Sequence, residues 1–460
     1  MRVLMFGWEF PPHIAGGLGT ACYGMTKGLA YNDVDVLFVM PSASGDEDQS
    51  AVKIINASDV AVDVVNATVD EFLGKVQFVH IGTNMIPYVD PQDFTTMVEE
   101  ERKRQIKSFR VQYGQKYKFS GKYGANLMEE VARYAMVGAT IAMQYKDQFD
   151  VIHAHDWLTY LAGIAAKQLT GKPLVVHMHA TSYDRASDDQ VDTRVVDLET
   201  KGMMAADKVM AVSELTRNIC INRYGIDPDK VVAVHNAVDF TGREKLEVER
   251  NVKEKVVTFL GRVTYQKGPE YFIEAAAKVL KRCNNVRFVM AGSGDMLNRC
   301  IRHVARLGIS DRFHFTGFLR GKEVHKMFAL SDVYVMPSIS EPFGISPLEA
   351  MQTNVPSIIS KQSGCAEILN YALKVDFWDV DAMSDAIYGL LNYPAIAQLA
   401  ARCGYDEVNS IKWNDVAAKI KGIYQEVIDK KQIKPNNHEK EYLSVFSGTS
   451  AKQIEIIQIL

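Results

Sequence analysis

The sequence predicts an α/β protein with two doubly wound domains, each built around a parallel sheet. With 460 residues the chain is too long for one ordinary domain, and its 47% hydrophobic and 23% charged residues are typical of a globular protein. Short apolar, β-prone runs alternate with segments of helical periodicity, which is the pattern of βαβ units. The alternation starts again after residue 255, so we expect a second domain of the same architecture.

The first domain is expected to span residues 1–240. Its predicted strands begin at Val3, Val34, Val76, Asp150, Pro173 and Asp207. Residues 99–123 include the charged run EEERKRQIKSFR followed by several aromatic residues. We interpret them as a helical insertion with a solvated face rather than as a binding patch.

The second domain is expected at residues 255–413, after a linker near residues 240–254. The linker is polar, rich in charge and free of apolar periodicity. The predicted strands of this domain begin at Val256, Val286, Phe313, Asp332 and Pro356. The tail at residues 433–460 begins polar and ends apolar, so docking against the body and partial disorder are both open for it.

Charge and hydropathy exclude several classes of partner. The formal net charge of −4 gives no global basic field, so neither nucleic acid nor an anionic membrane is expected. No apolar run is long enough for a membrane span, and the first one is too short for a signal peptide. The cysteines form no CxxC pair, which predicts neither a disulfide framework nor a zinc site and favours a cytoplasmic location; they stand at positions 22, 220, 283, 300, 365 and 403.

The most informative segment is EPFGISPLE, which places Glu341 and Glu349 around a turn and the start of a short helix. A buried strand is predicted before it, from Val333, and Ser346 with the following proline indicates the helix N-terminus. Such a terminus suits a phosphate, and two carboxylates can accept hydrogen bonds from hydroxyls. Together they favour a nucleotide sugar as ligand. The alternative is structural: Glu349 closes a capping box on Ser346, and Glu341 merely ends a strand.

Two glycine-rich turns also follow predicted strands. Gly16, Gly17 and Gly19 precede a helix near the N-terminus, where they would allow the backbone to approach a phosphate or a sugar. Such turns equally serve tight packing, so this pattern alone is weak. The segment AGSGDM, after the strand from Val286, belongs to the same category.

Two cations stand in one loop at the start of the second domain. Arg262 and Lys267 follow the strand from Val256 and precede a helix that Pro269 can open. A guanidinium and an ammonium at the carboxyl end of a strand can clamp a diphosphate and neutralise the charge of a departing nucleoside diphosphate. We prefer this interpretation to a pair of solvated loop cations.

Four histidines end two successive strands of the first domain, in the segments HAHDW and HMH. Alternation places His153 and His155 on one face of the sheet, and His177 and His179 repeat the pattern. A metal cluster is the less favoured interpretation, because no carboxylate or open position is fixed nearby. Hydrogen bonds to substrate or to main-chain carbonyls are expected instead. The chain lacks GxSxG, GxxxxGK[ST] and HExxH motifs, which argues against the commonest hydrolases, NTPases and metalloproteases.

Taken in order, these motifs resemble the retaining glycosyltransferases of the GT-B fold, in the family-4 and glycogen or starch synthase superfamily. The resemblance covers nearly the whole chain and rests on EFPPHIAGGLG, HAHDW, VHNAVD, GRVTYQKG, AGSGDM, FTGFL, EPFGISPLEAM and SGCAEI. It implies two Rossmann-like domains that face a central crevice, the second binding the donor. It also implies a C-terminal helix, expected at residues 414–432, that returns to the first domain.

The resemblance implies roles for individual residues of the second domain. Arg262 and Lys267 would hold the donor diphosphate, and Glu349 would bind the ribose hydroxyls. The transferred sugar and one phosphate would be bound by Glu341 together with the backbone of Phe343, Gly344 and Ile345.

In the first domain, the resemblance places His155 beside the sugar. Gly17, with Gly16 next to it, would lie at the diphosphate. His155, Arg262, Lys267 and Glu341 are therefore the predicted catalytic residues.

The resemblance further implies transfer with retention and without a metal or other cofactor. The donor would be UDP-glucose or ADP-glucose, and the acceptor a carbohydrate, with an α-1,4-glucan as first choice. One departure weakens the glucan assignment, because glycogen synthases of this type carry a lysine where this chain has Ile14. A family-4 enzyme acting on a lipid, cell-envelope or small-sugar acceptor is the alternative. A nucleotide-sugar epimerase or a non-catalytic binder is the alternative from another class.

Overall fold

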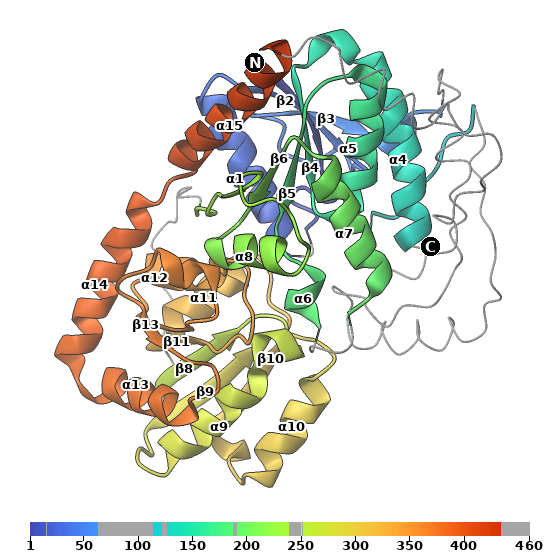
Figure 1. The fold of residues 1–460 in the computed structure, drawn as a ribbon. Coiled ribbons are helices and arrows are strands. Elements are labelled where there is room, and N and C mark those ends of the chain that lie inside the picture. The colour runs from blue at the N-terminus through green and yellow to red at the C-terminus, as the bar shows by residue number, and fades with distance from the viewer. Residues whose placement is uncertain are drawn as a thin grey trace, which may run out of the picture.

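The computed structural model describes residues 1–14, 16–62, 114–121, 127–186, 191–238, 250 and 252–433. Within these residues the chain forms two α/β units, each with its own parallel sheet (Figure 1). Most of the predicted linker, of the predicted tail and of the predicted insertion at residues 99–123 lies outside the described residues, as does the strand predicted at Val76.

The N-terminal sheet has seven parallel strands in the order β3-β2-β1-β4-β5-β6-β7. Its strands are β1 (Arg2–Phe6), β2 (Asp35–Met40), β3 (Lys53–Asn56), β4 (Val151–His155), β5 (Leu174–Met178), β6 (Lys208–Ala211) and β7 (Val231–Ala233). The sequence did not predict β3 or β7, which have only four and three residues and lie at the two edges. Such short edge strands carry little periodicity.

Helices cover both faces of this sheet because its strands are apolar on both sides. One core packs α4, α5 and α7 against the sheet, and a second core packs α1 and the C-terminal helix α15 against the other face (Figure 1). The helices of this unit are α1 (Gly17–Tyr31), α4 (Leu127–Gln144), α5 (Trp157–Thr170), α6 (Ser182–Arg185), α7 (Thr193–Ala205) and α8 (Glu214–Asn222).

The C-terminal sheet has six parallel strands in the order β10-β9-β8-β11-β12-β13. They are β8 (Lys255–Leu260), β9 (Val286–Ala291), β10 (Phe313–Gly317), β11 (Val333–Met336), β12 (Ser357–Ser360) and β13 (Leu373–Val375). The surrounding helices are α9 (Pro269–Leu280), α10 (Leu297–Arg306), α11 (Lys322–Leu330), α12 (Ile345–Gln352), α13 (Val380–Asn392) and α14 (Pro394–Ser410). Pro269 opens α9 as predicted, whereas the three-residue edge strand β13 was not predicted.

The last described helix, α15 (Trp413–Ile433), returns to the N-terminal unit and packs along α1 (Figure 1). The contact depends on two glycines of α1. A Cβ atom at Gly24 would lie 2.1 Å from the indole nitrogen of Trp413, and one at Gly28 would lie 2.4 Å from the Trp413 carbonyl oxygen. Both ends of the described chain therefore belong to the same unit.

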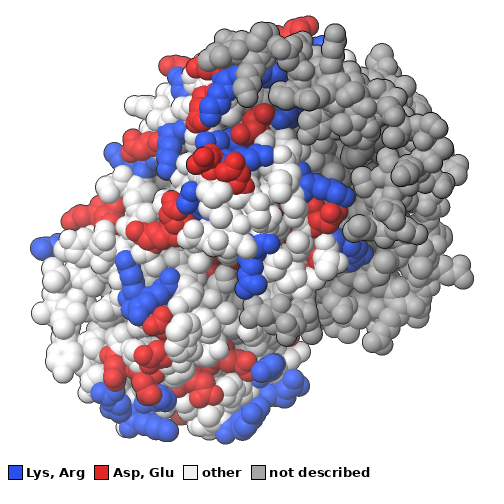
Figure 2. Space-filling view, in the orientation of Figure 1, with Lys and Arg blue, Asp and Glu red and all other residues white. Residues whose placement is uncertain are grey.

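The visible surface carries basic and acidic side chains interspersed over both units, without a broad field of one sign (Figure 2). This mixture agrees with the small net charge of −4. None of the helices that the structure describes has the length and apolar character needed to cross a bilayer.

Candidate active site

The predicted site residues lie at or after the carboxyl ends of four strands, β1, β4, β8 and β11, which flank the points where the strand order of each sheet reverses. The strand order reverses between β1 and β4 in the first sheet and between β8 and β11 in the second. In open α/β sheets, ligands bind beyond the carboxyl ends of the strands at such switch points. The glycine turn follows β1, and the HAHDW segment lies at the end of β4. The two cations follow β8, and EPFGISPLE follows β11.

At the second switch point, Lys267 and Glu341 form an ion pair between Nζ and Oε2. Both side chains are largely buried, with 19% and 9% of their surfaces exposed. Ser338 lies at the start of the loop between β11 and α12, and its hydroxyl donates to Glu341 Oε2 at 3.3 Å. A cation and a carboxylate that stand 74 residues apart in the sequence therefore meet in one place.

Arg262 lies in the same loop, half-buried, and its Nη2 donates to Gln266 Oε1 at 3.2 Å. The guanidinium also acts on Asp295 of the AGSGDM segment. Burial raises the pKa of Asp295, and the charge of Arg262 opposes this rise.

The glycines of AGSGDM serve packing in this structure. A Cβ at Gly292 would lie 1.8 Å from the Gly261 carbonyl oxygen, and one at Gly294 would lie 2.4 Å from that of Val263. Gly292 also has a φ of 147°, which favours glycine. The turn therefore packs against the loop that carries Arg262. Tight packing is one of the two roles that the sequence allowed for this glycine turn.

The start of α12 lies within the EPFGISPLE segment, but the predicted capping box is absent. The helix begins at Ile345 with Gly344 as N-cap, and no side chain caps it. Gly344 adopts a φ of 95°, and a Cβ there would lie 3.1 Å from Glu341 Cγ. The capping interpretation of Ser346 and Glu349 was therefore wrong, because the N-cap is Gly344, two residues before Ser346. Glu349 is half-buried, one turn into the helix.

The start of α1 faces the start of α12 across the two units. Gly16 is the N-cap of α1 and again no side chain caps the helix. Gly17 is exposed, and a Cβ at this position would lie 3.7 Å from Ile345 Cδ1. Each helix N-terminus carries partial positive charge and unpaired N–H groups. Two such termini opposite one another form an arrangement suited to a diphosphate.

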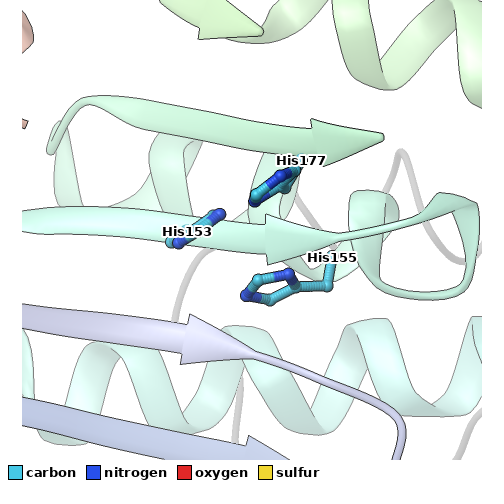
Figure 3. A group of neighbouring side chains, drawn as sticks. All are labelled: His153, His155 and His177. Carbon is cyan, nitrogen blue, oxygen red and sulfur yellow. The ribbon is translucent and has the colours of Figure 1, made fainter. Parts of the chain in front are cut away.

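The strand-end histidines are placed differently from the expectation that they face an open crevice. His153, His155 and His177 are 0% exposed and lie on the face of the sheet covered by α1 and α15 (Figure 3). His153 Nδ1 lies 2.6 Å from the hydroxyl oxygen of Tyr424 on α15, and His155 Nδ1 lies 2.9 Å from His179 Nε2. Burial lowers the pKa of His155 well below its ordinary value, so its imidazole is neutral.

Two segments that the sequence singled out only through the family resemblance join the two units. Glu367 of SGCAEI accepts hydrogen bonds from the backbone N–H groups of Glu214 and Leu215 at 2.8 and 2.7 Å. These groups begin α8, so a carboxylate of one unit caps a helix of the other. His235 of VHNAVD lies with its Nε2 2.6 Å from the same carboxylate. Single-sequence reasoning had no signal for this pairing, because the partners lie more than 130 residues apart.

A second polar contact crosses between the units beside the site. The hydroxyl of Ser340 donates to Asp184 Oδ1 at 2.6 Å. Nearby, Phe343 is 3% exposed, its ring centroid lies 6.3 Å from that of His235, and its carbonyl oxygen accepts from the Cys365 N–H at 2.7 Å. The turn between β11 and α12 is thus held from both units.

We predict that Glu367→Ala lowers the stability of the protein by about 1–2 kcal/mol at pH 7, the usual cost of losing a helix cap. Burial raises the pKa of Glu367, but His235 and the two N–H donors outweigh it and hold the pKa below its ordinary value. The stabilisation by Glu367 is therefore complete above pH about 4.5. It is lost as the pH falls through the lowered pKa that Glu367 has in the folded protein. Thermal unfolding at pH 7 and at pH 3.5 measures both effects.

The matched control is Glu407→Ala, which removes a carboxylate that accepts from Asn370 and Tyr371 within the C-terminal unit. Both variants lose stability, but only the Glu367 variant should widen the small-angle scattering profile, because Glu367 contacts the other unit whereas the Glu407 contacts lie within one unit. An unchanged melting temperature in Glu367→Ala contradicts the capping role.

Two parallel α/β units with their switch points opposed define the GT-B architecture, and the chain is a glycosyltransferase of this class. The family model described as the starch synthase catalytic domain matches residues 2–233, half of the chain, and the chain belongs to this family. A model for glycosyl transferases group 1 matches residues 242–407.

Individual proteins agree with this family. The chain is 27% identical over 453 residues to an uncharacterized glycosyltransferase, MJ1607, of Methanocaldococcus jannaschii, covering 92% of this chain and 98% of the relative. It is 24% identical over 447 residues to a glycogen synthase of Mycobacterium tuberculosis, covering 92% and 94%. Among solved structures, Anabaena HepE in complex with UDP and glucose superposes with a TM-score of 0.61 at 16% identity, covering 93% and 100%.

Proposed function

We propose that the protein is a retaining glycosyltransferase that moves glucose from UDP-glucose or ADP-glucose to the non-reducing end of an α-1,4-glucan. The observation that carries the proposal is the meeting of Lys267 and Glu341 at the switch point of the C-terminal sheet. At this switch point, the Lys267 ammonium can bind a leaving diphosphate, and the adjacent Glu341 carboxylate can accept hydrogen bonds from sugar hydroxyls. The glycogen synthase relative supports the glucan as acceptor.

In this proposal the diphosphate lies between the starts of α1 and α12, near Gly17 and Ile345. Lys267 exchanges part of its contact with Glu341 for the phosphate oxygens, and Arg262 adds a second positive charge. Negative charge grows on the diphosphate as the glycosidic bond to the sugar breaks, so both cations stabilise the transition state more than the ground state.

The remaining proposed contacts involve the sugar and the ribose. Glu341 would accept hydrogen bonds from the sugar hydroxyls, and the backbone of Phe343 and Gly344 would adjoin it. Glu349 would accept from the ribose hydroxyls. The Nε2 atom of His155 is buried and has no hydrogen-bond partner among the described residues, so a sugar hydroxyl that reached it would supply one.

The test is transfer from UDP-, ADP- and GDP-glucose to maltooligosaccharides, with the product's anomeric configuration read by NMR. The proposal expects elongation with an α-1,4 linkage. If no nucleotide glucose extends an α-glucan, the glucan acceptor is refuted. We further propose a reducing, cytoplasmic setting, which the six unpaired cysteines support.

A family-4 transferase acting on a lipid, cell-envelope or small-sugar acceptor is the second candidate, and Ile14 favours it. This side chain is 39% exposed and packs over the first turn of α1, where a Cβ at Gly19 would lie 2.3 Å from its Cγ2. We predict that Ile14→Lys leaves the fold intact and changes α-glucan elongation only modestly, because Arg262 and Lys267 already supply two charges. If Ile14→Lys raised the rate of α-glucan elongation by on the order of 100-fold, as expected when a missing transition-state contact is restored, the charges of Arg262 and Lys267 would not be sufficient.

A nucleotide-sugar epimerase or a silent binder is the alternative from another class. An epimerase converts the donor to its 2-epimer without any acceptor, which NMR of donor and protein alone would detect. A silent binder would bind UDP in calorimetry and turn over no donor. Either result would refute the transferase proposal while leaving the fold assignment intact.

We predict that glucose transfer survives treatment with EDTA. Lys267, Arg262 and the uncapped helix starts supply the positive charge that a divalent ion provides in metal-dependent transferases. The rate is measured in chelator and again after dialysis into magnesium or manganese. A loss of activity on chelation that magnesium or manganese restores would contradict the prediction.

A further inference from the structure

Three imidazoles gather inside the N-terminal unit, where β4 and β5 lie side by side (Figure 3). His153 and His155 project from β4, and His177 of β5 stands in register with His155. The ring centroids of His153 and His155 are 4.1 Å apart, and each is 5.5 Å from that of His177. One nitrogen from each ring can be chosen so that all three lie within 4.8 Å of one another.

The hydrogen-bond pattern of the cluster is asymmetric. The Nδ1 atoms of His153 and His155 have partners in Tyr424 and His179. Their Nε2 atoms, and both ring nitrogens of His177, are buried without a hydrogen-bond partner among the described residues. All three side chains are fully buried. Unpartnered polar atoms at such depth are costly, so this group of nitrogens requires an explanation.

We propose that His153, His155 and His177 bind one zinc ion. A metal-bound histidine commonly gives one ring nitrogen to the ion and the other to a second group, and two of these three residues already show this arrangement. Three neutral imidazoles, without a thiolate or carboxylate among them, suit zinc with an open fourth position.

The geometry requires a small contraction of the cluster. Zinc–nitrogen bonds of about 2.0–2.1 Å in a tetrahedral arrangement place the nitrogens roughly 3.3 Å apart. The present separations are up to 4.8 Å, and the His177 ring now stacks at 12° and 27° to the rings of His153 and His155, so zinc binding requires the rings to rotate out of this stack. The ion would then join β4 to β5 and, through the hydroxyl of Tyr424, both strands to α15.

Zinc bound at this site would also affect sugar transfer, an inference that rests on the proposed function. The Nε2 atom of His155 cannot bind zinc and a sugar hydroxyl at the same time. Zinc is therefore expected to slow sugar transfer, and chelation to relieve this inhibition. The site is thus regulatory or structural, which agrees with the predicted tolerance to EDTA.

The test measures zinc directly, without donor or acceptor. The full-length protein is produced in zinc-supplemented medium, passed over a chelating resin and analysed by elemental mass spectrometry. We expect about one zinc per chain in the wild type and none in His177→Ala. His314→Ala is the matched control, because His314 is an exposed residue on β10 of the other sheet, and it should keep the ion.

Protein produced with cobalt supplies a second readout, the visible absorption of a tetrahedral cobalt site. If His177→Ala fails to fold, His177→Asn replaces it, because the amide retains polar atoms in the cluster. A wild type that carries no more zinc than the His177 variant overturns the site. Zinc binding by the wild type, together with no glucose transfer after the zinc has been removed by chelation, would instead refute the proposed function and leave the zinc site standing.

Discussion

Replacing Lys267 by alanine is expected to reduce turnover by at least about 100-fold, which corresponds to about 2.7 kcal/mol of transition-state stabilisation. The side chain carries the charge nearest to Glu341 at the end of β8 and β11. Because its contact with the diphosphate strengthens as the leaving group departs, the loss should fall mainly on kcat rather than on the donor KM. Steady-state kinetics with UDP-glucose and ADP-glucose separates the two constants.

The substitution also removes the ion-pair partner of Glu341, whose side chain is only 9% exposed. Thermal unfolding of the variant therefore accompanies the kinetics, and Lys267→Met, which keeps much of the apolar stem, limits the packing loss. Lys278→Ala is the matched control, since Lys278 forms a surface ion pair with Asp381 on the same domain. A folded Lys267→Ala enzyme with nearly normal kcat would show that the lysine does not stabilise the leaving group.

The sequence predicted the parallel architecture because both sheets are built from buried, β-branched strands whose periodicity is strong. It also indicated where the candidate site residues lie, because the two loop cations and the EPFGISPLE segment each follow a predicted buried strand. Arg262, Lys267 and Glu341 were identified in this way before their contacts were known. The ordering of the strands then explains why they meet, because β8 and β11 are neighbours at the switch point.

Other features depend on long-range packing, for which one sequence has no signal. The histidines of HAHDW were expected to face the crevice, but α15 returns over their face of the sheet and Tyr424 closes it. Likewise, Glu367 has nothing in its surroundings along the chain to reveal that it caps α8. The capping-box interpretation of Ser346 was wrong for a local reason. Gly344 can adopt a positive φ, so the helix starts before Ser346.

Gly17→Leu is expected to weaken donor binding by about 100-fold or more while leaving the fold intact. A Cβ at Gly17 meets only Ile345 Cδ1, at an ordinary contact distance of 3.7 Å, and leucine is a good helix former. A leucine side chain would therefore be accommodated, but it would fill the space between the starts of α1 and α12 where the diphosphate is proposed to lie. Losing one or two charge-assisted hydrogen bonds between the helix N–H groups and the diphosphate, at about 1.5–3 kcal/mol each, is sufficient for a loss of this size. Calorimetry with UDP and circular dichroism measure affinity and fold.

Two glycine variants make this result interpretable. Gly422 lies on the exposed side of α15, and a Cβ there would have no atom of the described residues within 4 Å, so Gly422→Leu adds the same bulk to a helix without approaching the site. Gly17→Ala adds only the Cβ at 3.7 Å from Ile345 and should keep most of the affinity. If bulk at position 17 fills the anion site, UDP affinity should fall stepwise from glycine through alanine to leucine at this position and should not change in Gly422→Leu. A folded Gly17→Leu protein that binds UDP as tightly as the wild type would mean that the nucleotide binds away from the facing helix starts.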